Sequence, residues 1–263
     1  MRIYSSITPT SCVLLCALFL VSPSATAIEF TSTEKQSILL ELYTSEGCSS
    51  CPPADHWLSS LKQDPRLWQQ IIPLAFHVDY WNYLGWDDRF SSATYSKRQR
   101  NYAERGYAKT VYTPGFFKNG REWRAWFRNR DLDNSNKGRK VGLLQATWEH
   151  NELQARFKPL NIPYQSLQLH VALLAMGIQD EVTAGENDGK ILRHDFVVLS
   201  LKHFSASYHA NIPQWKTAYS PSQLLSDNNL FANKSNSLQF ALAIWVSRDN
   251  DPTPIQAVGG LLP

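Results

Sequence analysis

A single C-x-x-C sequence constrains this chain more than any other feature. Cys48 and Cys51 follow the apolar run 38–43 and come directly before Pro52 and Pro53. Proline is tolerated in a helix only in its first turn, so a helix is predicted to begin there. The pair therefore lies between a buried strand and a helix, which is the context that distinguishes a redox-active C-x-x-C from a chance pair.

The chemistry of this position favours thiol–disulfide exchange. A thiolate rather than a thiol attacks a disulfide, and the positive end of a helix lowers the pKa of a thiol. We expect Cys48 to be the exposed attacking thiol and Cys51 the more buried resolving thiol. No cofactor is expected besides the redox-active Cys48–Cys51 disulfide.

Other uses of the same two cysteines stay open. The alternatives are that the pair forms half of a zinc site, an inert structural disulfide, or a copper site completed by a histidine. A zinc site would need a second pair of ligands, and the seven histidines of the chain are scattered along it. We therefore predict no metal site from the sequence.

The first 27 residues are typical of a secretory signal peptide, with a retained membrane anchor as the alternative. Arg2 is the only charge among them, residues 13–21 are apolar, and Ala27 ends a small-residue cleavage sequence. The apolar run is too short to span a bilayer. Cleavage removes the other two of the four cysteines, and we expect an exported protein with no membrane span after cleavage.

Strands and helices are predicted to alternate in the first half of the chain. The strands are expected at 38–43, 71–80 and 111–118, and the helices at 55–62 and 90–105. Asn119-Gly120 is a strong turn signal for a hairpin that continues to Trp126. Strands connected through helices predict a parallel sheet with right-handed crossovers.

The second half has a different pattern. The polar residues 129–140 predict a linker. Apolar and polar residues then alternate from Leu144 to Phe157, and further strand-like runs begin at 167, 194 and 238. Because hardly any helical pattern is present, residues 141–263 are predicted to form an antiparallel β-sandwich.

The charge of the chain excludes little. Its formal net charge of +3 requires neither nucleic acid nor an acidic membrane as a partner. Between Lys97 and Arg130 there are ten Lys or Arg residues and two acidic ones, with tryptophans among them. Such a segment invites a nucleic-acid interpretation, but export argues against that partner. We expect a basic surface that faces solvent or a protein.

Several longer strings resemble a known family. ELYTSEGCSSCPPAD (41–55), LAFHVDYWNYLGWDDRF (74–90), RQRNYAERGYAKTVYTPGFFKNGR (98–121) and GENDGKILRHDFVV (185–198) are similar to the secreted bacterial family catalogued as domain of unknown function 1223. The resemblance covers nearly all of the chain after residue 27. It implies a thioredoxin-like domain over 28–128, followed by the β-sandwich, in a bacterial protein that is periplasmic or secreted.

Thr113-Pro114 is similar to the thioredoxin segment that carries a cis-proline. In thioredoxin-like folds this loop lies against the C-x-x-C, and the backbone before the proline pairs with a bound peptide. The resemblance therefore assigns Thr113 and Pro114 to substrate binding. The alternative is an ordinary proline on an edge strand.

Glu41 is the least expected residue of the first strand, because leucines flank it. A buried carboxylate is costly unless it is paired, and burial raises its pKa. Its position is close to where thioredoxins keep a buried acid that moves the proton of the resolving thiol. We hypothesise this catalytic role for Glu41, with a salt bridge or an outward orientation as the alternative.

The loop after the second strand carries four further candidates. If the first two strands are parallel, residues 77–86 leave the sheet at the same edge as Cys48, where ligands bind in open α/β sheets. Trp81 and Trp86 are predicted to form a wall or lid over the substrate, and His77 and Asp79 to tune the site. A packed aromatic corner is the alternative.

These observations predict an exported thiol–disulfide oxidoreductase. Its substrates would be proteins or small thiols and disulfides, and a membrane redox partner is a further candidate. The alternative is a non-catalytic binding or copper-chaperone-like module that uses the same vicinal thiols.

Overall fold

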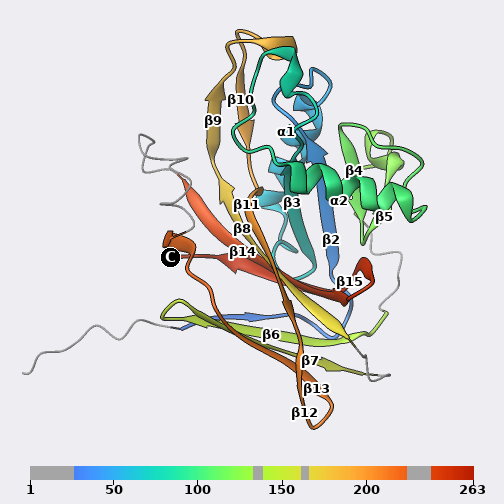
Figure 1. Ribbon diagram of the computed structural model, residues 1–263, viewed down its shortest axis with the longest axis vertical. Coiled ribbons are helices and arrows are strands. Elements are labelled where there is room, and N and C mark those ends of the chain that lie inside the picture. The colour runs from blue at the N-terminus through green and yellow to red at the C-terminus, as the bar shows by residue number, and fades with distance from the viewer. Residues whose placement is uncertain (1–26, 133–138, 161–165, 224–237) are drawn as a thin grey trace, which may run out of the picture.

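The computed structural model describes residues 27–132, 139–160, 166–223 and 238–263. The predicted signal peptide lies, except for residue 27, outside the described residues, as do six residues of the predicted linker, 133–138. The described chain is mixed α/β and consists mostly of strands (Figure 1). Of the helices in these ranges, none is both long and apolar enough to cross a membrane.

The elements of the first half correspond closely to the predicted order. They are β1 (Ile28–Thr31), β2 (Ile38–Thr44), α1 (Pro52–Ser60), β3 (Ile71–His77), α2 (Ala93–Glu104), β4 (Gly115–Lys118) and β5 (Arg121–Glu122). The predicted hairpin after Lys118 is present, with positive φ at Asn119 and Gly120. It is shorter than expected, because residues Arg124–Phe127 form a 3-10 turn where the strand was predicted to continue.

The described part of the second half consists mostly of strands. The strands are β6 (Gly142–Glu149), β7 (Glu152–Pro159), β8 (Leu167–Met176), β9 (Ile178–Glu181), β10 (Ile191–His194), β11 (Val197–Ser205), β12 (Ser207–His209), β13 (Ile212–Ala218), β14 (Gln239–Arg248) and β15 (Asp251–Leu261). The 3-10 turn Gly185–Asn187 lies between β9 and β10. The strand predicted from His194 onward is divided, because Phe196 has a positive φ between β10 and β11.

An eight-stranded mixed sheet runs through the molecule in the order β15-β14-β8-β11-β3-β2-β4-β5. The predicted parallel pairing is present between β2 and β3. It was wrong for β4, which is antiparallel to β2, and β11, predicted to belong to the antiparallel sandwich, is instead parallel to β3. The sheet contains strands from both sides of the predicted linker. In addition, β1 pairs with β6 in a five-stranded antiparallel sheet, β1-β6-β7-β13-β12.

The two helices cover opposite faces of the sheet around β2. Leu40 and Leu42 pack with α1, whereas Leu39 and Tyr43 pack with α2, as expected because neighbouring strand residues point to opposite faces. Toward β8, β14 and β15, the five-stranded sheet packs against the eight-stranded one through a large apolar core. The β9–β10 hairpin and α1 lie together at the other end of the molecule (Figure 1).

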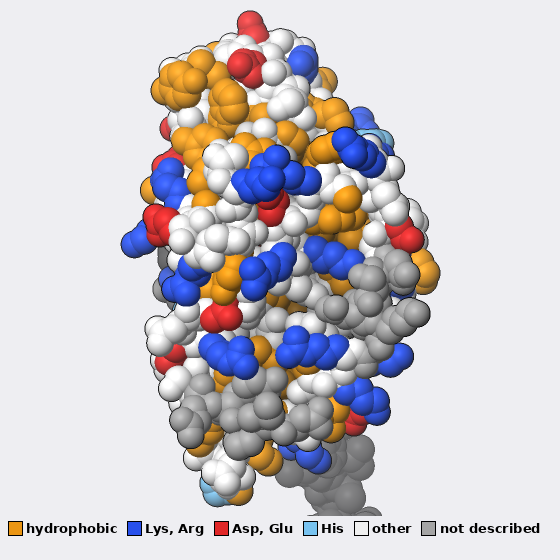
Figure 2. Space-filling view, turned by 90° about the vertical axis from the view of Figure 1, so that its right-hand side faces the viewer, with side chains coloured by type: hydrophobic (Ala, Val, Ile, Leu, Met, Phe, Trp, Pro, Cys, Tyr) orange, Lys and Arg blue, Asp and Glu red, His pale blue; other side chains and the backbone are white. Residues whose placement is uncertain are grey.

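The basic segment, residues 97–130, includes most of α2 and all of the β4–β5 hairpin. Figure 2 shows Lys and Arg side chains spread over this side of the molecule, with acidic and hydrophobic side chains among them. Arg98 pairs with Glu41, and Arg124 with Glu122. Part of the positive charge of this segment is therefore balanced within the protein.

Candidate functional site

The two cysteines lie where the ends of two parallel strands meet a helix. In the register of β2 and β3, Thr44 lies beside His77, so the loops that follow leave the sheet at the same edge. Cys51 is the N-cap of α1, and its Cα lies 5.5 Å from that of Cys48, to which it is joined by a disulfide. The predicted position of the C-x-x-C between strand and helix is confirmed.

Both cysteines are completely buried, whereas Ser49 and Ser50 between them are exposed. The expectation of an exposed Cys48 is therefore wrong for the disulfide form. The loop between β9 and β10 supplies part of the cover. Asn187, itself buried, donates from Nδ2 to the backbone carbonyl of Cys48 at 3.0 Å.

The same loop also holds the exposed part of the C-x-x-C. Glu186 accepts hydrogen bonds from the backbone N–H and the hydroxyl of Ser49, at 3.0 and 2.7 Å. These two bonds lower the pKa of Glu186. Asn187 donates a further bond to the carbonyl of Glu46 at 2.8 Å. The loop therefore links the second half of the chain to both sides of Cys48.

Thr113 lies directly against the disulfide. The Thr113–Pro114 peptide bond is cis, and the Thr113 hydroxyl donates to Cys48 Sγ at 3.2 Å. Trp81 Nε1 donates to the same hydroxyl at 2.7 Å. The structure thus brings together Thr113, Pro114, Trp81 and the two cysteines.

The other candidates of the aromatic loop lie in different surroundings. Trp86 Nε1 donates to Glu46 Oε2 at 2.8 Å, which ties this loop to the segment just before the C-x-x-C. Asp79 instead accepts a hydrogen bond from Ser96 of α2. Of these two predicted residues, only Trp86 contacts the segment that leads to the disulfide in the described structure.

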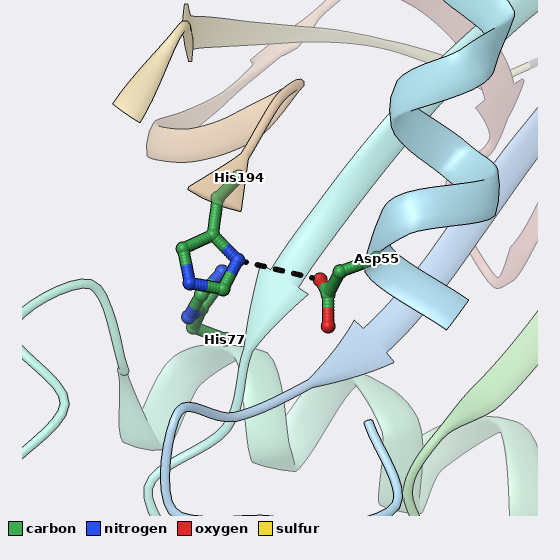
Figure 3. Close-up of side chains that lie close together, drawn as sticks. All are labelled: Asp55, His77 and His194. Carbon is green, nitrogen blue, oxygen red and sulfur yellow. Dashed lines mark ion pairs between the residues drawn. The ribbon is translucent and has the colours of Figure 1, made fainter. Parts of the chain in front are cut away.

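Asp55, one helical turn after Cys51, belongs to a buried cluster of acids and histidines (Figure 3). Its Oδ2 accepts from the Thr44 hydroxyl at 2.7 Å, and its Oδ1 lies 3.5 Å from His194 Nδ1. The other ring nitrogen, His194 Nε2, lies 3.3 Å from Glu46 Oε1. Burial by itself lowers the pKa of His194, but Asp55 and Glu46 outweigh it and raise this pKa to about 10.

His77 completes the cluster from the end of β3. Its Nδ1 lies 2.7 Å from Asp88 Oδ2, which also accepts from the backbone N–H of Glu46 at 2.9 Å. Burial alone would raise the pKa of Asp88, but His77 and these hydrogen bonds lower it. The rings of His77 and His194 meet edge to face. We call Glu46, Asp55, His77, Asp88 and His194 the acidic histidine cluster.

Only His77 of this cluster was predicted as a site residue. The other four were not, because the seven histidines are scattered along the chain and no metal site was predicted. A signal was nevertheless present: all five residues lie within the strings 41–55, 74–90 and 185–198 that carry the family resemblance.

The structure does not bring Glu41 together with the cysteines. It lies on the face of β2 that α2 covers, where Arg98 donates to Oε1 at 2.6 Å. The hydroxyls of Tyr43 and Tyr102 also donate to this carboxylate, each at 3.0 Å. Glu41 thus forms the salt bridge that was the alternative to a proton relay, and α1 with Cys51 lies on the opposite face.

Two solved structures are similar to this chain. Protein AGR_C_4864 from Agrobacterium tumefaciens is 22% identical, with a TM-score of 0.59 over 88% of this chain and 95% of that one. HBP35 of Porphyromonas gingivalis is 12% identical, with a TM-score of 0.57 over 88% of this chain and 76% of that one. At such identities the similarity shows the fold alone.

Comparison with curated proteins gave no match. The model of one protein family, in contrast, matches residues 39–230, which include the C-x-x-C, the cis-proline loop and the β9–β10 hairpin. This match confirms the resemblance found in the sequence. The chain therefore belongs to the family described as protein of unknown function, DUF1223.

Proposed function

We propose that this protein is an exported thiol–disulfide oxidoreductase. In this proposal residues 28–128 form a thioredoxin-like domain and residues 141–263 a β-sandwich, with one sheet common to both. The observation that carries the proposal is the Cys48–Cys51 disulfide at the start of α1, with the Thr113 hydroxyl 3.2 Å from Cys48 Sγ. This arrangement supplies a cysteine pair, a helix N-terminus and a docking loop at one place.

The exchange step starts from the reduced protein. The Cys48 thiolate attacks one sulfur of a substrate disulfide, and the other substrate sulfur leaves as a thiolate. Cys51, as a thiolate, then attacks Cys48 Sγ in the mixed disulfide and releases the second substrate thiolate. The substrate disulfide is thereby reduced to two thiols and the protein is oxidised, and the reverse sequence oxidises a dithiol.

Access to Cys48 requires that its cover moves. In the disulfide form Asn187 and Thr113 contact Cys48, and Glu186 contacts Ser49. If the hydrogen bonds between Glu186 and Ser49 are released, the β9–β10 loop can move away from the C-x-x-C segment and make Cys48 accessible. Helix α1 would stay packed against the sheet during this movement. We assign substrate binding to the edge formed by Thr113, Pro114 and Trp81.

Substrates of this reaction class are proteins or small molecules that carry a disulfide or two thiols. The signal-peptide pattern of the first 27 residues supports export to the periplasm or the medium. In either place, a membrane redox protein is a suitable partner, because it would return Cys48 and Cys51 to the oxidation state in which they start the reaction.

The test is a trapping experiment with the reduced protein and oxidised glutathione. With Cys51→Ala, a glutathione adduct should accumulate on Cys48, because no second thiol resolves it. With Cys48→Ala, the adduct on Cys51 should form at least tenfold more slowly. Equal rates for the two variants, or no adduct on either, would contradict the proposed roles.

A further inference from the structure

The acidic histidine cluster contains ring nitrogens that make no well-formed hydrogen bond. Within the described residues, His77 Nε2 is buried without a hydrogen-bond partner. The two nitrogens of His194 are also buried without a well-formed hydrogen bond, although they face Asp55 Oδ1 at 3.5 Å and Glu46 Oε1 at 3.3 Å. Buried polar atoms without partners are uncommon, since each carries a desolvation cost of about 1–3 kcal/mol. Their concentration in one place points to something that they bind.

Asp55, His77 and His194 each offer one potential ligand atom at the same place. These three atoms all lie within 4.8 Å of one another, and all three residues are buried. Figure 3 shows the two imidazoles and the carboxylate converging from β3, β10 and α1. Ligand atoms around a tetrahedral zinc ion lie about 3.3 Å apart, so small side-chain rotations would close the site.

Each of the three residues also has a partner that orients its other polar atom. His77 Nδ1 faces Asp88 at 2.7 Å, which leaves Nε2 free to bind. His194 Nε2 faces Glu46 at 3.3 Å, which leaves Nδ1 on the side of Asp55. Asp55 Oδ2 accepts from Thr44 at 2.7 Å. Metal-binding histidines usually donate their other ring N–H to a carboxylate, a backbone carbonyl or water, and the two carboxylates here fit that pattern.

The charge of the cluster favours an additional cation. Three buried carboxyl groups surround two imidazoles, so even two imidazolium ions would not balance three carboxylates. A divalent ion placed between Asp55 and the two histidines would balance two of the three carboxylate charges with neither ring protonated, as much charge as two imidazolium protons would balance.

We propose that Asp55, His77 and His194 bind a divalent transition-metal ion of the zinc type, one helical turn from the Cys48–Cys51 disulfide. Two imidazoles and one carboxylate are a ligand set of zinc and of non-haem iron sites. Glu46 and Asp88 are positioning residues that orient the imidazoles. The site does not use the cysteines and is therefore independent of the proposed redox reaction.

The first test is a Co²⁺ titration of the protein with its disulfide intact, with Zn²⁺ as the competitor. We expect one ion per chain, the visible absorption of a low-coordinate cobalt site, and no sulfur-to-cobalt charge-transfer band. His77→Gln and His194→Gln should weaken binding by at least about 100-fold, and Asp88→Asn by about 10- to 100-fold. His170→Gln, a buried histidine outside the cluster, is the control and should bind as the wild type does.

Anomalous diffraction at the zinc edge gives an answer that needs no variant. Crystals of the wild-type protein soaked in Zn²⁺ should show a peak between Asp55, His77 and His194. A peak only at surface histidines would overturn the proposal, as would unchanged Co²⁺ binding in both His→Gln variants. If no metal ion binds, the proposal is also wrong, and the carboxylates of the cluster would instead stabilise a proton on His194.

Discussion

Two histidine pairs of this protein have the same ring contact but different surroundings. In the acidic histidine cluster, the rings of His77 and His194 meet edge to face with centroids 4.9 Å apart. On the face covered by α2, His170 of β8 and His203 of β11 meet in the same way at 4.7 Å. We call the second group, together with Arg98, the arginine–histidine cluster.

The nitrogens of the two pairs are used differently. His170 Nε2 pairs with the Ser247 hydroxyl and His170 Nδ1 with His203 Nδ1, both at 2.7 Å. Burial, Arg98 and His203 together hold the pKa of His170 well below its usual range. In the acidic histidine cluster, the carboxylates of Asp55 and Glu46 face the two nitrogens of His194 and raise its pKa, whereas His77 Nε2 has no partner.

The difference teaches that burial and ring pairing do not by themselves make a ligand site. His170 has a partner on each nitrogen and a guanidinium nearby, so it is already satisfied and repels cations. His77 and His194 have carboxylates as neighbours, and His77 Nε2 has no partner, so this pair favours a cation. The following predictions test this contrast, beginning with the change expected to have the largest effect.

Glu41→Gln should destabilise the protein by about 3–5 kcal/mol, because it leaves the Arg98 charge buried and uncompensated. The side chain of Arg98 is only 9% exposed and that of Glu41 is fully buried. Urea denaturation measures the effect. Glu34→Gln, which breaks the exposed pair with Lys140, is the control and should cost less than about 1 kcal/mol. A loss below 1 kcal/mol for Glu41→Gln would show that the salt bridge does not anchor the arginine–histidine cluster.

Asn187→Ala should destabilise the protein by about 1–3 kcal/mol and speed the reduction of the Cys48–Cys51 disulfide by dithiothreitol. The substitution removes the bonds to the carbonyls of Glu46 and Cys48, which tie the β9–β10 loop to the disulfide. Timed alkylation followed by mass spectrometry measures the rate. His203→Gln, in the other cluster, should leave that rate unchanged. An unchanged rate in Asn187→Ala would exclude this loop as the cover of Cys48.

The depressed pKa of His170 should make the protein less stable in acid. As the pH falls below about 6.5, the unfolded chain binds a proton at this residue before the folded chain does. Stability should therefore fall by up to about 1.4 kcal/mol per pH unit from this group. Urea denaturation of wild type and His170→Gln between neutral and mildly acidic pH measures it. Equal slopes for the two proteins would contradict the assignment.

Thr113→Val should have the smallest effect. It removes the hydroxyl that donates to Cys48 Sγ, and a neutral hydrogen bond contributes about 0.5–1.5 kcal/mol. We expect the reduced protein to react roughly 2- to 10-fold more slowly with oxidised glutathione. Thr110→Val, in the exposed part of the same loop, is the matched control. A rate that is equal in the two variants would show that the hydroxyl does not assist Cys48.

Local pattern predicted the individual elements well. The continuous apolar run at 38–43 became β2, and the alternation from Leu144 to Phe157 became the β6–β7 hairpin, with His150 and Asn151 at positive φ in its turn. The periodicity of the sequence does not show which distant strands pair with each other. The parallel contact of β3 with β11 and the pairing of β1 with β6 each join residues more than one hundred positions apart.

For the site too, the residues of local motifs were predicted correctly, whereas those placed by strand alternation or by distant pairing were not. Cys48, Cys51, Thr113 and Trp81 lie together as expected. Glu41 was placed by its sequence distance from Cys48, but the alternation of β2 decides its face, and residue 41 points to α2. Glu186, Asn187 and His194 lie in the string 185–198 that carries the family resemblance, but their place at the site was not predicted, because the β9–β10 hairpin brings them to a loop about 140 positions earlier.

The reduction potential of the Cys48–Cys51 pair tests the proposed reaction most directly. The protein is equilibrated in glutathione buffers of graded ratio, and the disulfide is quantified by alkylation and mass spectrometry. We predict a reversible couple between about −120 and −270 mV, the range of known exchange catalysts. A disulfide that resists reduction below about −300 mV would be a structural cross-link and would contradict the oxidoreductase.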